Sequence, residues 1–278
     1  INGEIAILGF CEDFGLAREI AARPLVYDEH TLRLAKKYDA EVFVKINTGM
    51  NRLGFSTIGE TASAVKNLRV LGVFTHLSSA DGDDAADRRI TEAQIKNFME
   101  AELVVKNEKD VPFYAENSAA LIKYGRFFDG ARIGIALYGV NPVPGDKTPL
   151  LPVMTFRAAV IAINTVKKGD FIGYSRGYRA KKDMRVAIIS TGYADGLPRA
   201  LSNKGMIFCN GQFLKIVGKV SMDSVAVDAG DADVKIMDEV VVFGDEITVT
   251  DVANRADTLP YEILTGVSER VKRVYKNP

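Results

Sequence analysis

The sequence predicts an α/β region built on a parallel sheet, followed by a mainly antiparallel β domain. Two observations carry this prediction. In the first half, short apolar runs alternate with segments of helical spacing, which is the pattern of βαβ units. In the second half, apolar runs rich in β-branched residues follow one another with turns between them. At about 150 residues per domain, the 278 residues allow two modest domains or one large barrel.

The elements of the first half follow from these runs. Apolar runs typical of parallel strands buried on both faces occupy 5–10, 42–46, 70–77, 113–118 and 131–139. Helical spacing occupies 12–22, 58–68 and 91–107. We expect Thr91 to cap the N-terminus of the last helix, where the negative charge of Glu92 would be stabilised by the positive end of the helix dipole.

A proline-rich segment separates the halves. Four of the nine prolines lie within 140–152, which indicates a linker, and we place the domains at 1–147 and 148–278. Expected strands occupy 156–166, 185–191, 206–220 and 239–244. Asn210-Gly211 predicts a type I′ hairpin turn. Helices are expected at 249–255 and after Pro260, which would occupy the first helical position.

Composition excludes several classes of protein. Thirty-six basic and 36 acidic residues balance, which argues against a nucleic-acid partner, and no apolar run approaches the ~18 residues of a membrane span. Cys11 and Cys209 cannot form a disulfide framework, and two histidines leave little material for zinc. The sequence opens at Ile1 without a signal-peptide pattern. We therefore expect a cytoplasmic protein acting on small molecules, with natural sequence missing ahead of Ile1.

Polar groups follow four successive strands of the first half. They are Lys45 with Arg52, His76, Asn117 with Ser118, and Arg132. Ligands bind at the carboxyl ends of parallel strands, so the joint pattern predicts a site. Each residue alone has a plainer interpretation: a solvated loop cation, a core histidine, or an N-cap asparagine. Gly134 would allow a phosphate to approach the backbone, but no nucleotide-binding motif is present.

Tyrosines next to glycines distinguish the second half. GYSRGY contains Tyr174, and TGYADG contains Tyr193. A tyrosine is a poor base at its ordinary pKa of about 10, and nearby arginines would lower that value. From the residues alone, aromatic turns remain the plainer interpretation. KVSMDSV, which contains Met222, is interpreted as core plus turn.

Taken together, these motifs resemble the alanine racemase family. KINTGMNRLGF, THLSSAD, ENSAA, RIGIALYG, GYSRGY, STGYADGLPR, GKVSMDSV and YEILTGVSERVKRVY occur in the family's order and span the whole chain. The resemblance implies a (β/α)8 TIM-type barrel followed by a β domain. It also implies a homodimer with shared active sites, pyridoxal 5′-phosphate as cofactor, and interconversion of L-alanine and D-alanine for peptidoglycan by a two-base mechanism.

The resemblance also assigns roles. One base is a Schiff-base lysine and the other is Tyr174 of the partner subunit. Arg132 faces the pyridine nitrogen, and His76 links Arg132 to Tyr174. The resemblance assigns the cofactor phosphate to Asn117, Ser118, Gly134 and Ile135. It assigns the substrate and its entrance to Arg52, Met222 and Tyr193, and it implies that Lys45 is carbamylated.

Two departures from the family pattern follow. A motif of the type VKANAYGHG, which carries the Schiff-base lysine, is absent from the sequence, so we expect that the first barrel strands are missing from this chain. Glu269 stands where some members have a phosphate-contacting tyrosine, and we expect it to point outward. The alternatives are a broader amino-acid racemase, a decarboxylase of the same cofactor class, which Arg132 argues against, and a non-catalytic fragment that binds the cofactor phosphate.

Overall fold

The computed structural model describes residues 4–276. The chain divides into two compact units. The first comprises residues 1–137 and 141–150, and the second comprises 138–140 and 151–278. The chain passes between the units after residues 137, 140 and 150, that is, just before and within the proline-rich segment.

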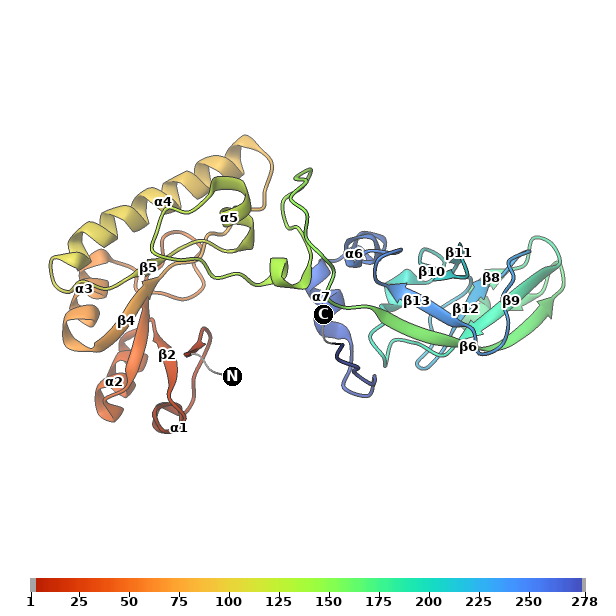
Figure 1. Cartoon of the computed structure of the whole chain (residues 1–278), viewed down its shortest axis with the longest axis horizontal. Helices are drawn as coiled ribbons and strands as arrows, with labels where there is room; N and C mark the ends of the chain where they lie inside the picture. The colour runs from red at the N-terminus through yellow and green to blue at the C-terminus, as the bar shows by residue number, and fades with distance from the viewer. Residues whose placement is uncertain (1–3, 277–278) are drawn as a thin grey trace. The chain divides into compact units, whose positions relative to one another are not determined.

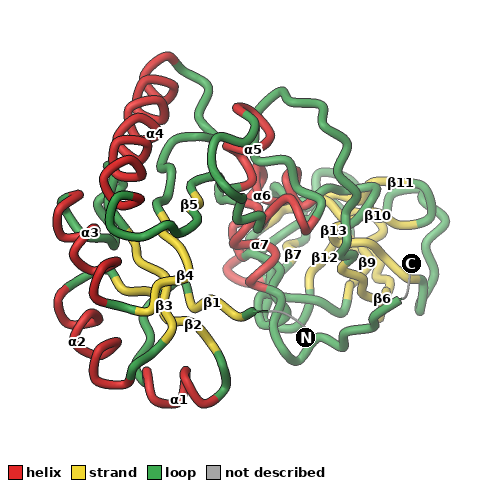
Figure 2. The backbone as a smooth tube through the Cα atoms, turned by 60° about the vertical axis from the view of Figure 1, so that its left-hand side comes forward, coloured by secondary structure: helices red, strands yellow, loops and turns green. Residues whose placement is uncertain are grey.

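The first unit contains a parallel sheet whose strands follow one another in chain order (Figure 1). The strands are β1 (Ile5–Ile7), β2 (Ala22–Val26), β3 (Glu41–Lys45), β4 (Arg69–Phe74) and β5 (Phe113–Tyr114). The helices that follow them are α1 (Phe14–Glu19), α2 (Glu29–Tyr38), α3 (Ile58–Asn67), α4 (Ala85–Lys106) and α5 (Ser118–Tyr124). Figure 2 shows α2, α3 and α4 along one side of this sheet. The described unit is thus a curled half-barrel of parallel strands, and not a complete eight-stranded barrel.

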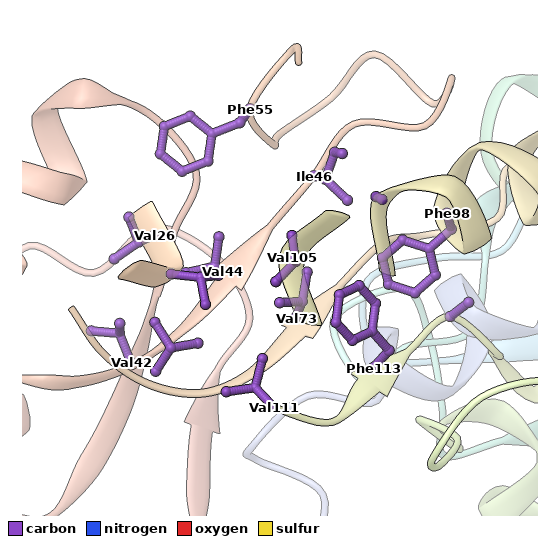
Figure 3. Packing of buried hydrophobic residues seen from close by; sticks show 14 of the residues in the cluster. Val26, Val42, Val44, Ile46, Phe55, Val73, Phe98, Val105, Val111 and Phe113 are labelled. Carbon is purple, nitrogen blue, oxygen red and sulfur yellow. The ribbon is translucent and has the colours of Figure 1, made fainter. Parts of the chain in front are cut away.

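The two faces of the sheet bury different side chains, because successive residues of a strand point to opposite faces. Val42, Val44 and Val73 pack in one cluster with Phe98 and Val105 of α4 (Figure 3). On the opposite face, Leu25, Phe43 and Phe74 form a separate cluster. The rings of Phe43 and Phe74 stack with their centroids 4.5 Å apart. This second face is the one that carries the candidate site.

Several predictions for this unit are wrong. The strand at 5–10 is shorter than expected and is not buried, since Ile5 and Leu8 are each 47% exposed at the edge of the described sheet. The helix expected at 12–22 ends at Glu19, and β2 and α2 were not predicted.

The expected cap and the last expected strand also differ. Asp84, not Thr91, caps α4, because its carboxylate accepts hydrogen bonds from the amides of Ala86 and Asp87. Thr91 is buried inside the helix and donates to the carbonyl of Asp87. Segment 131–139 forms a 3-10 turn, η1 (Ile135–Tyr138), in place of a strand. Its apolar side chains suggested a strand, but the carbonyl of Gly134 accepts from the amide of Leu137.

The second unit is built on a six-stranded antiparallel sheet in the order β11-β10-β13-β6-β9-β12. The long central strand β6 (Phe156–Val166) pairs with β13 (Glu239–Phe243) on one side and with β9 (Met184–Ile189) on the other. The remaining strands are β10 (Met206–Cys209), β11 (Gln212–Lys215) and β12 (Val225–Asp228), and a separate small hairpin is formed by β7 (Phe171–Ile172) and β8 (Tyr178–Arg179).

The hairpin turn and the two helices predicted for the second unit are confirmed. Asn210 and Gly211 have φ of 46° and 81° and join β10 to β11, as a type I′ turn requires. Helix α6 (Val249–Ala256) forms where expected, and α7 (Pro260–Gly266) begins with its proline in the first turn. Strands β7, β8 and β12 were not predicted. Among the described helices, none has the length and apolar character needed to cross a membrane.

Candidate active site

Lys45 ends β3 and lies on the inner face of the sheet, two residues after Phe43. It is 7% exposed. Burial, and then the nearby charges of Arg52 and Arg132, lower the pKa of its amine to about 8. Within the described chain its ammonium forms no hydrogen bond or ion pair. The amine is therefore still mostly protonated near neutral pH, but a far larger fraction of it is neutral and nucleophilic than at the ordinary lysine pKa of 10.5.

Arg52 is held by the loop that follows β3. The side-chain oxygen of Asn47 accepts hydrogen bonds from the amides of Gly49 and Asn51, each at 3.0 Å. Gly54 closes the loop with φ of 131°, and a Cβ there would lie 2.5 Å from the amide nitrogen of Asn47. The loop thus needs glycine at this position and turns Arg52 back toward the strand ends.

Arg132 is anchored across the ends of β4 and β5. Its Nη1 donates to the carbonyl of Tyr114 at 2.8 Å, and its Nη2 donates to the carbonyl of Thr75 at 2.6 Å. The guanidinium lies over the ring of Phe74, 5.0 Å from its centroid. Burial lowers its pKa to about 10, so Arg132 remains a cation at neutral pH.

His76 lies beside Arg132, with its Nδ1 3.3 Å from Nη2 of the arginine. Burial, and then the charges of Arg132, Arg52 and Lys45, lower the pKa of this imidazole to about 4. His76 is therefore neutral at neutral pH. Since an arginine can only donate, Nδ1 accepts, and the imidazole proton belongs on Nε2.

These four residues line one cavity of about 230 Å³, together with Phe74, Thr75 and Gly134. None of its lining residues is acidic. In the described part of the chain, Lys45, Arg52 and Arg132 form no ion pair with a carboxylate. Although the buried carboxylate of Glu116 acts on Arg132 from outside the lining, three clustered cations without a paired carboxylate make a cavity electropositive. The cavity is therefore built to receive anionic groups.

The start of α5 contacts the turn that begins at Gly134, a residue of the cavity lining. Ser118 is 4% exposed, and its hydroxyl accepts hydrogen bonds from the amides of Gly134, at 3.1 Å, and Ala136, at 3.4 Å. A Cβ at Gly134 would meet nothing within 4 Å, so the space beside its Cα is clear, while its amide is bonded to Ser118. Ile135 is buried between them.

Asn117 has a local role in the structure. Its Oδ1 accepts from the amide of Ala120 at 2.9 Å, which caps α5, and its Nδ2 donates to the carbonyl of Leu77 at 3.3 Å. It thus ties α5 to the residue after His76, as the plainer N-cap interpretation anticipates.

In the second unit, Tyr174 is presented by a turn of unusual backbone conformation. Gly173, Ser175 and Arg176 have φ of 74°, 54° and 54°. The turn packs against the backbone of Lys219, because a Cβ at Gly173 would lie 3.3 Å from the amide nitrogen of Lys219. The Tyr174 side chain is 70% exposed.

Tyr193 and Met222 lie on two adjoining loops of the same unit. The amide of Tyr193 donates to the carbonyl of Ser221, and that of Ala194 donates to Met222, each at 3.0 Å. A Cβ at Gly192 would lie 2.3 Å from both carbonyl oxygens of Ser221 and Met222, so glycine is required for this approach. Both side chains are about half exposed.

Arg270 joins these two loops, a role that the sequence analysis missed. Its Nε lies 2.8 Å from Asp195 and its Nη2 lies 2.6 Å from Asp223. The second oxygen of Asp195 accepts from the amide of Gly192. Neighbouring Glu269 is exposed and forms no described ion pair. Only the acidic residues that follow Tyr193 and Met222 in TGYADG and SMD could have signalled this network.

Two buried residues near the strand ends were also missed. Glu116 accepts from the amides of Phe127 and Phe128, and its other oxygen is buried without a partner among the described residues. Gln94 of α4 contacts the backbone of His76. A glutamine at a buried helical position was the available signal.

Comparisons with known proteins identify the family of this chain. Residues 1–142 match the family model described as alanine racemase, N-terminal domain, and residues 153–275 match the model described as alanine racemase, C-terminal domain. An alanine racemase of Aquifex aeolicus is 35% identical over 276 residues, which cover 99% of this chain and 78% of that protein. One from Halothermothrix orenii is 36% identical over 262 residues, or 88% and 68% of the two chains.

Solved structures give the same result. The crystal structure of alanine racemase from Bartonella henselae with covalently bound pyridoxal phosphate superposes with a TM-score of 0.87 at 29% identity, covering 99% of this chain and 79% of that one. An alanine racemase of Clostridium difficile superposes with a TM-score of 0.89 at 29% identity, covering 98% and 76%. The chain belongs to the alanine racemase family.

Proposed function

We propose that this protein interconverts L-alanine and D-alanine with pyridoxal 5′-phosphate as cofactor. The observation that carries the proposal is the cavity at the strand ends, where Lys45, Arg52, His76 and Arg132 meet with no acidic lining residue. A cofactor phosphate and a substrate carboxylate are the anions that such a cavity suits. We place the reaction in the cytoplasm, where D-alanine would be supplied for peptidoglycan.

The residues present fit this cofactor. The amides of Gly134 and Ile135 and the hydroxyl of Ser118 would hold the phosphate, with the amide of Gly134 turning from Ser118 to the anion, and Asn117 would fix the start of α5 beside it. Arg132 has its Nη atoms committed to carbonyls, while its Nε forms no hydrogen bond within the described chain, so it remains available to the ring nitrogen. When bound, pyridoxal phosphate supplies an electron-withdrawing ring that acidifies the α-proton of alanine.

Arg132 would set the outcome of the reaction. Because an arginine keeps its proton, the ring nitrogen that it faces would stay unprotonated. This arrangement weakens the pull of the ring on electrons and favours prompt return of the proton to the α-carbon. A decarboxylase of this cofactor class instead pairs the ring nitrogen with a carboxylate, which the described cavity lacks.

His76 would transmit the charge of Arg132 to the second base. Its Nδ1 accepts from the arginine, so its Nε2–H is free to donate to a phenolate oxygen. We assign that oxygen to Tyr174 of a second copy of the chain, which removes or returns the α-proton on one face of alanine. Donation from Nε2–H stabilises the phenolate and makes the tyrosine a stronger acid.

Lys45 would act as a carbamate. Its lowered pKa increases the neutral amine, whose nitrogen would bond to the carbon of CO2 while one amine proton passes to solvent, and the resulting carbamate anion would pair with Arg52. Such an anion would hold Arg52 toward the substrate carboxylate. We assign Tyr193 and Met222 to the border of the substrate site and its entrance.

The base on the other face of alanine is the cofactor-linking lysine of the family. We propose that it lies outside these 278 residues, because the flanks of Lys45 match a later strand and no other lysine lines the described cavity. Borohydride reduction of the cofactor-loaded protein, followed by peptide mapping, tests this assignment. Label on Lys45 would overturn it.

The test of the proposed function is formation of D-alanine from L-alanine by the full-length protein with pyridoxal phosphate. The proposal predicts conversion in both directions with exchange of the α-proton for solvent deuterium. Parallel assays with serine and valine measure whether the substrate range is wider than alanine. Cofactor binding without exchange would contradict the proposal and favour a non-catalytic binding protein.

A further inference from the structure

The side-chain amide of Gln94 is fully hydrogen-bonded inside the first unit. It is 2% exposed on α4. Its Oε1 accepts from the amide of Ser78 at 2.9 Å and from the Ser78 hydroxyl at 3.0 Å. Its Nε2 donates to the carbonyl of His76 at 3.2 Å and to the hydroxyl of Thr48 at 3.4 Å. An amide offers two donors and two acceptor sites, and all four are occupied.

The bond to Thr48 starts a buried chain of hydrogen bonds. The hydroxyls of Thr48 and Thr75 lie 2.7 Å apart, and the Thr75 hydroxyl donates to the carbonyl of Ile46 at 3.1 Å. Because the Thr75 hydroxyl donates its only proton to the carbonyl of Ile46, the Thr48 hydroxyl must be the donor in its bond with Thr75. The direction is then fixed from Gln94 through Thr48 and Thr75 to Ile46. Successive hydrogen bonds of one direction polarise and strengthen each other.

This chain joins the two backbone segments that carry the site. Residues 46–49 follow Lys45 and lead into the loop of Arg52, while residues 75–78 contain His76. The carbonyl of Thr75 also accepts from Nη2 of Arg132. Gln94 itself is not among the residues that line the cavity. It therefore reaches the site from behind, through backbone and hydroxyl groups.

Packing alone does not account for a glutamine here. A methionine would fill nearly the same volume without the cost of burying a polar amide, a cost that only satisfied hydrogen bonds offset. The amide gives direction, since its donor and acceptor sides bind different segments. Exchange of the two sides would set its oxygen against the carbonyl of His76.

We infer that Gln94 is a positioning residue of the reaction, which fixes the spacing between the Arg52 loop and His76. The inference rests on the proposed function, because it takes these two residues as parts of the catalytic site. Displacement of catalytic groups by about 1 Å can cost up to about a hundredfold in rate. Loss of the amide should therefore lower turnover without unfolding the protein.

Gln94→Met and Thr91→Val form a matched pair of variants. Thr91 is also buried in α4, but its hydroxyl donates within its own helix to Asp87. We expect Gln94→Met to lower kcat by about tenfold or more, with a smaller change in KM, while Thr91→Val stays within about twofold of wild type. Thr48→Val breaks the same chain, and the double variant should be hardly worse than the worse single one, as coupled residues behave.

Amide hydrogen exchange gives a readout that is independent of the loaded enzyme. Segments 46–52 and 75–78 should exchange faster in Gln94→Met but not in Thr91→Val, with α2 unchanged in both. If the wild type is active and Gln94→Met matches Thr91→Val in both kinetics and amide exchange, the inference about Gln94 is overturned while the proposed function stands. A wild type that binds cofactor but does not racemise alanine would overturn the proposed function as well.

Discussion

Nη2 of Arg132 lies 3.3 Å from Nδ1 of His76, and the two side chains line one electropositive cavity. Burial, and then the charge of Arg132, keeps the imidazole neutral, and the contact with the arginine fixes its tautomer. The position of its proton on Nε2 follows from this one contact, because a guanidinium has no acceptor to offer.

The pH dependence of folding follows from the burial of His76 among these cations. The pKa of His76 is lowered to about 4 from an ordinary value of 6.5, so the unfolded chain binds a proton more readily at this position. His76 therefore disfavours folding increasingly as the pH falls from 6.5 to 4, and stability rises with pH through that window. We expect His76→Gln to flatten the pH dependence of the urea midpoint there. An unchanged slope would refute the burial argument, and His30→Gln, on the exposed side of α2, serves as the control.

Lys45 should carry CO2. With the amine pKa lowered to about 8, carbamate formation should increase as the pH rises from 6 toward 9. Protein equilibrated with 13C-bicarbonate is expected to show a carbamate carbon resonance that is lost in Lys45→Ala and retained in Lys123→Ala. A resonance retained in Lys45→Ala would assign the adduct elsewhere, and no resonance at all would leave Lys45 as a plain amine and contradict the prediction.

Arg132→Glu should change the reaction and not merely slow it. A carboxylic acid at this position would donate a proton to the ring nitrogen, which lengthens the life of the deprotonated substrate and promotes transamination. Pyruvate formed per racemisation event is expected to rise clearly above wild type. Thermal unfolding should be compared in parallel, because the guanidinium also anchors Tyr114 and Thr75. A folded variant with unchanged pyruvate yield would refute the role of Arg132.

Arg270 should act on substrate binding through the loops of Tyr193 and Met222. Arg270→Met removes its contacts with Asp195 and Asp223, so the loops lose a shared anchor and KM for alanine should rise several-fold with little change in kcat. Arg157→Met is a suitable control, since it breaks a comparable exposed ion pair with Glu239 in the same unit. Equal KM values for both variants would argue against a specific role.

Sequence reasoning located residues better than it located contacts. The parity of β3 places Lys45 on the face of Phe43, and a polar residue at each strand end suffices to suggest a site. Gln94, in contrast, is 18 residues beyond the carbonyl of His76 that it contacts, and only the packing of α4 on the sheet brings the two together. Arg270 and Asp223 are similarly 47 residues apart.

The errors have local physical causes. Thr91 resembles an N-cap in sequence, but the helix begins earlier, at Ala85. Asp84 therefore caps α4 by accepting hydrogen bonds from its first free amides. Segment 131–139 has the apolar content of a strand, yet Ser118 takes the amides of Gly134 and Ala136 that a strand would need for pairing. In both cases a side chain competes for backbone groups that periodicity alone cannot assign.

Sharing of one site by two copies of the chain is testable by mixing variants. Tyr174→Phe and Arg132→Glu homodimers should each be nearly inactive. If Tyr174 serves the cavity of the other copy, subunit exchange between them creates heterodimers with one intact site, and activity should reappear. Mixtures that stay inactive although exchange is seen by mass spectrometry would place both residues in the same copy's site.

The most direct test of the central claim is α-proton exchange in deuterated water by the full-length protein, followed separately from L-alanine and from D-alanine. We predict that wild type incorporates deuterium from both enantiomers as it interconverts them. Tyr174→Phe should bind cofactor normally but lose exchange from one enantiomer while keeping some exchange from the other. Undiminished exchange from both enantiomers in Tyr174→Phe, or no exchange in cofactor-loaded wild type, would contradict the two-base account.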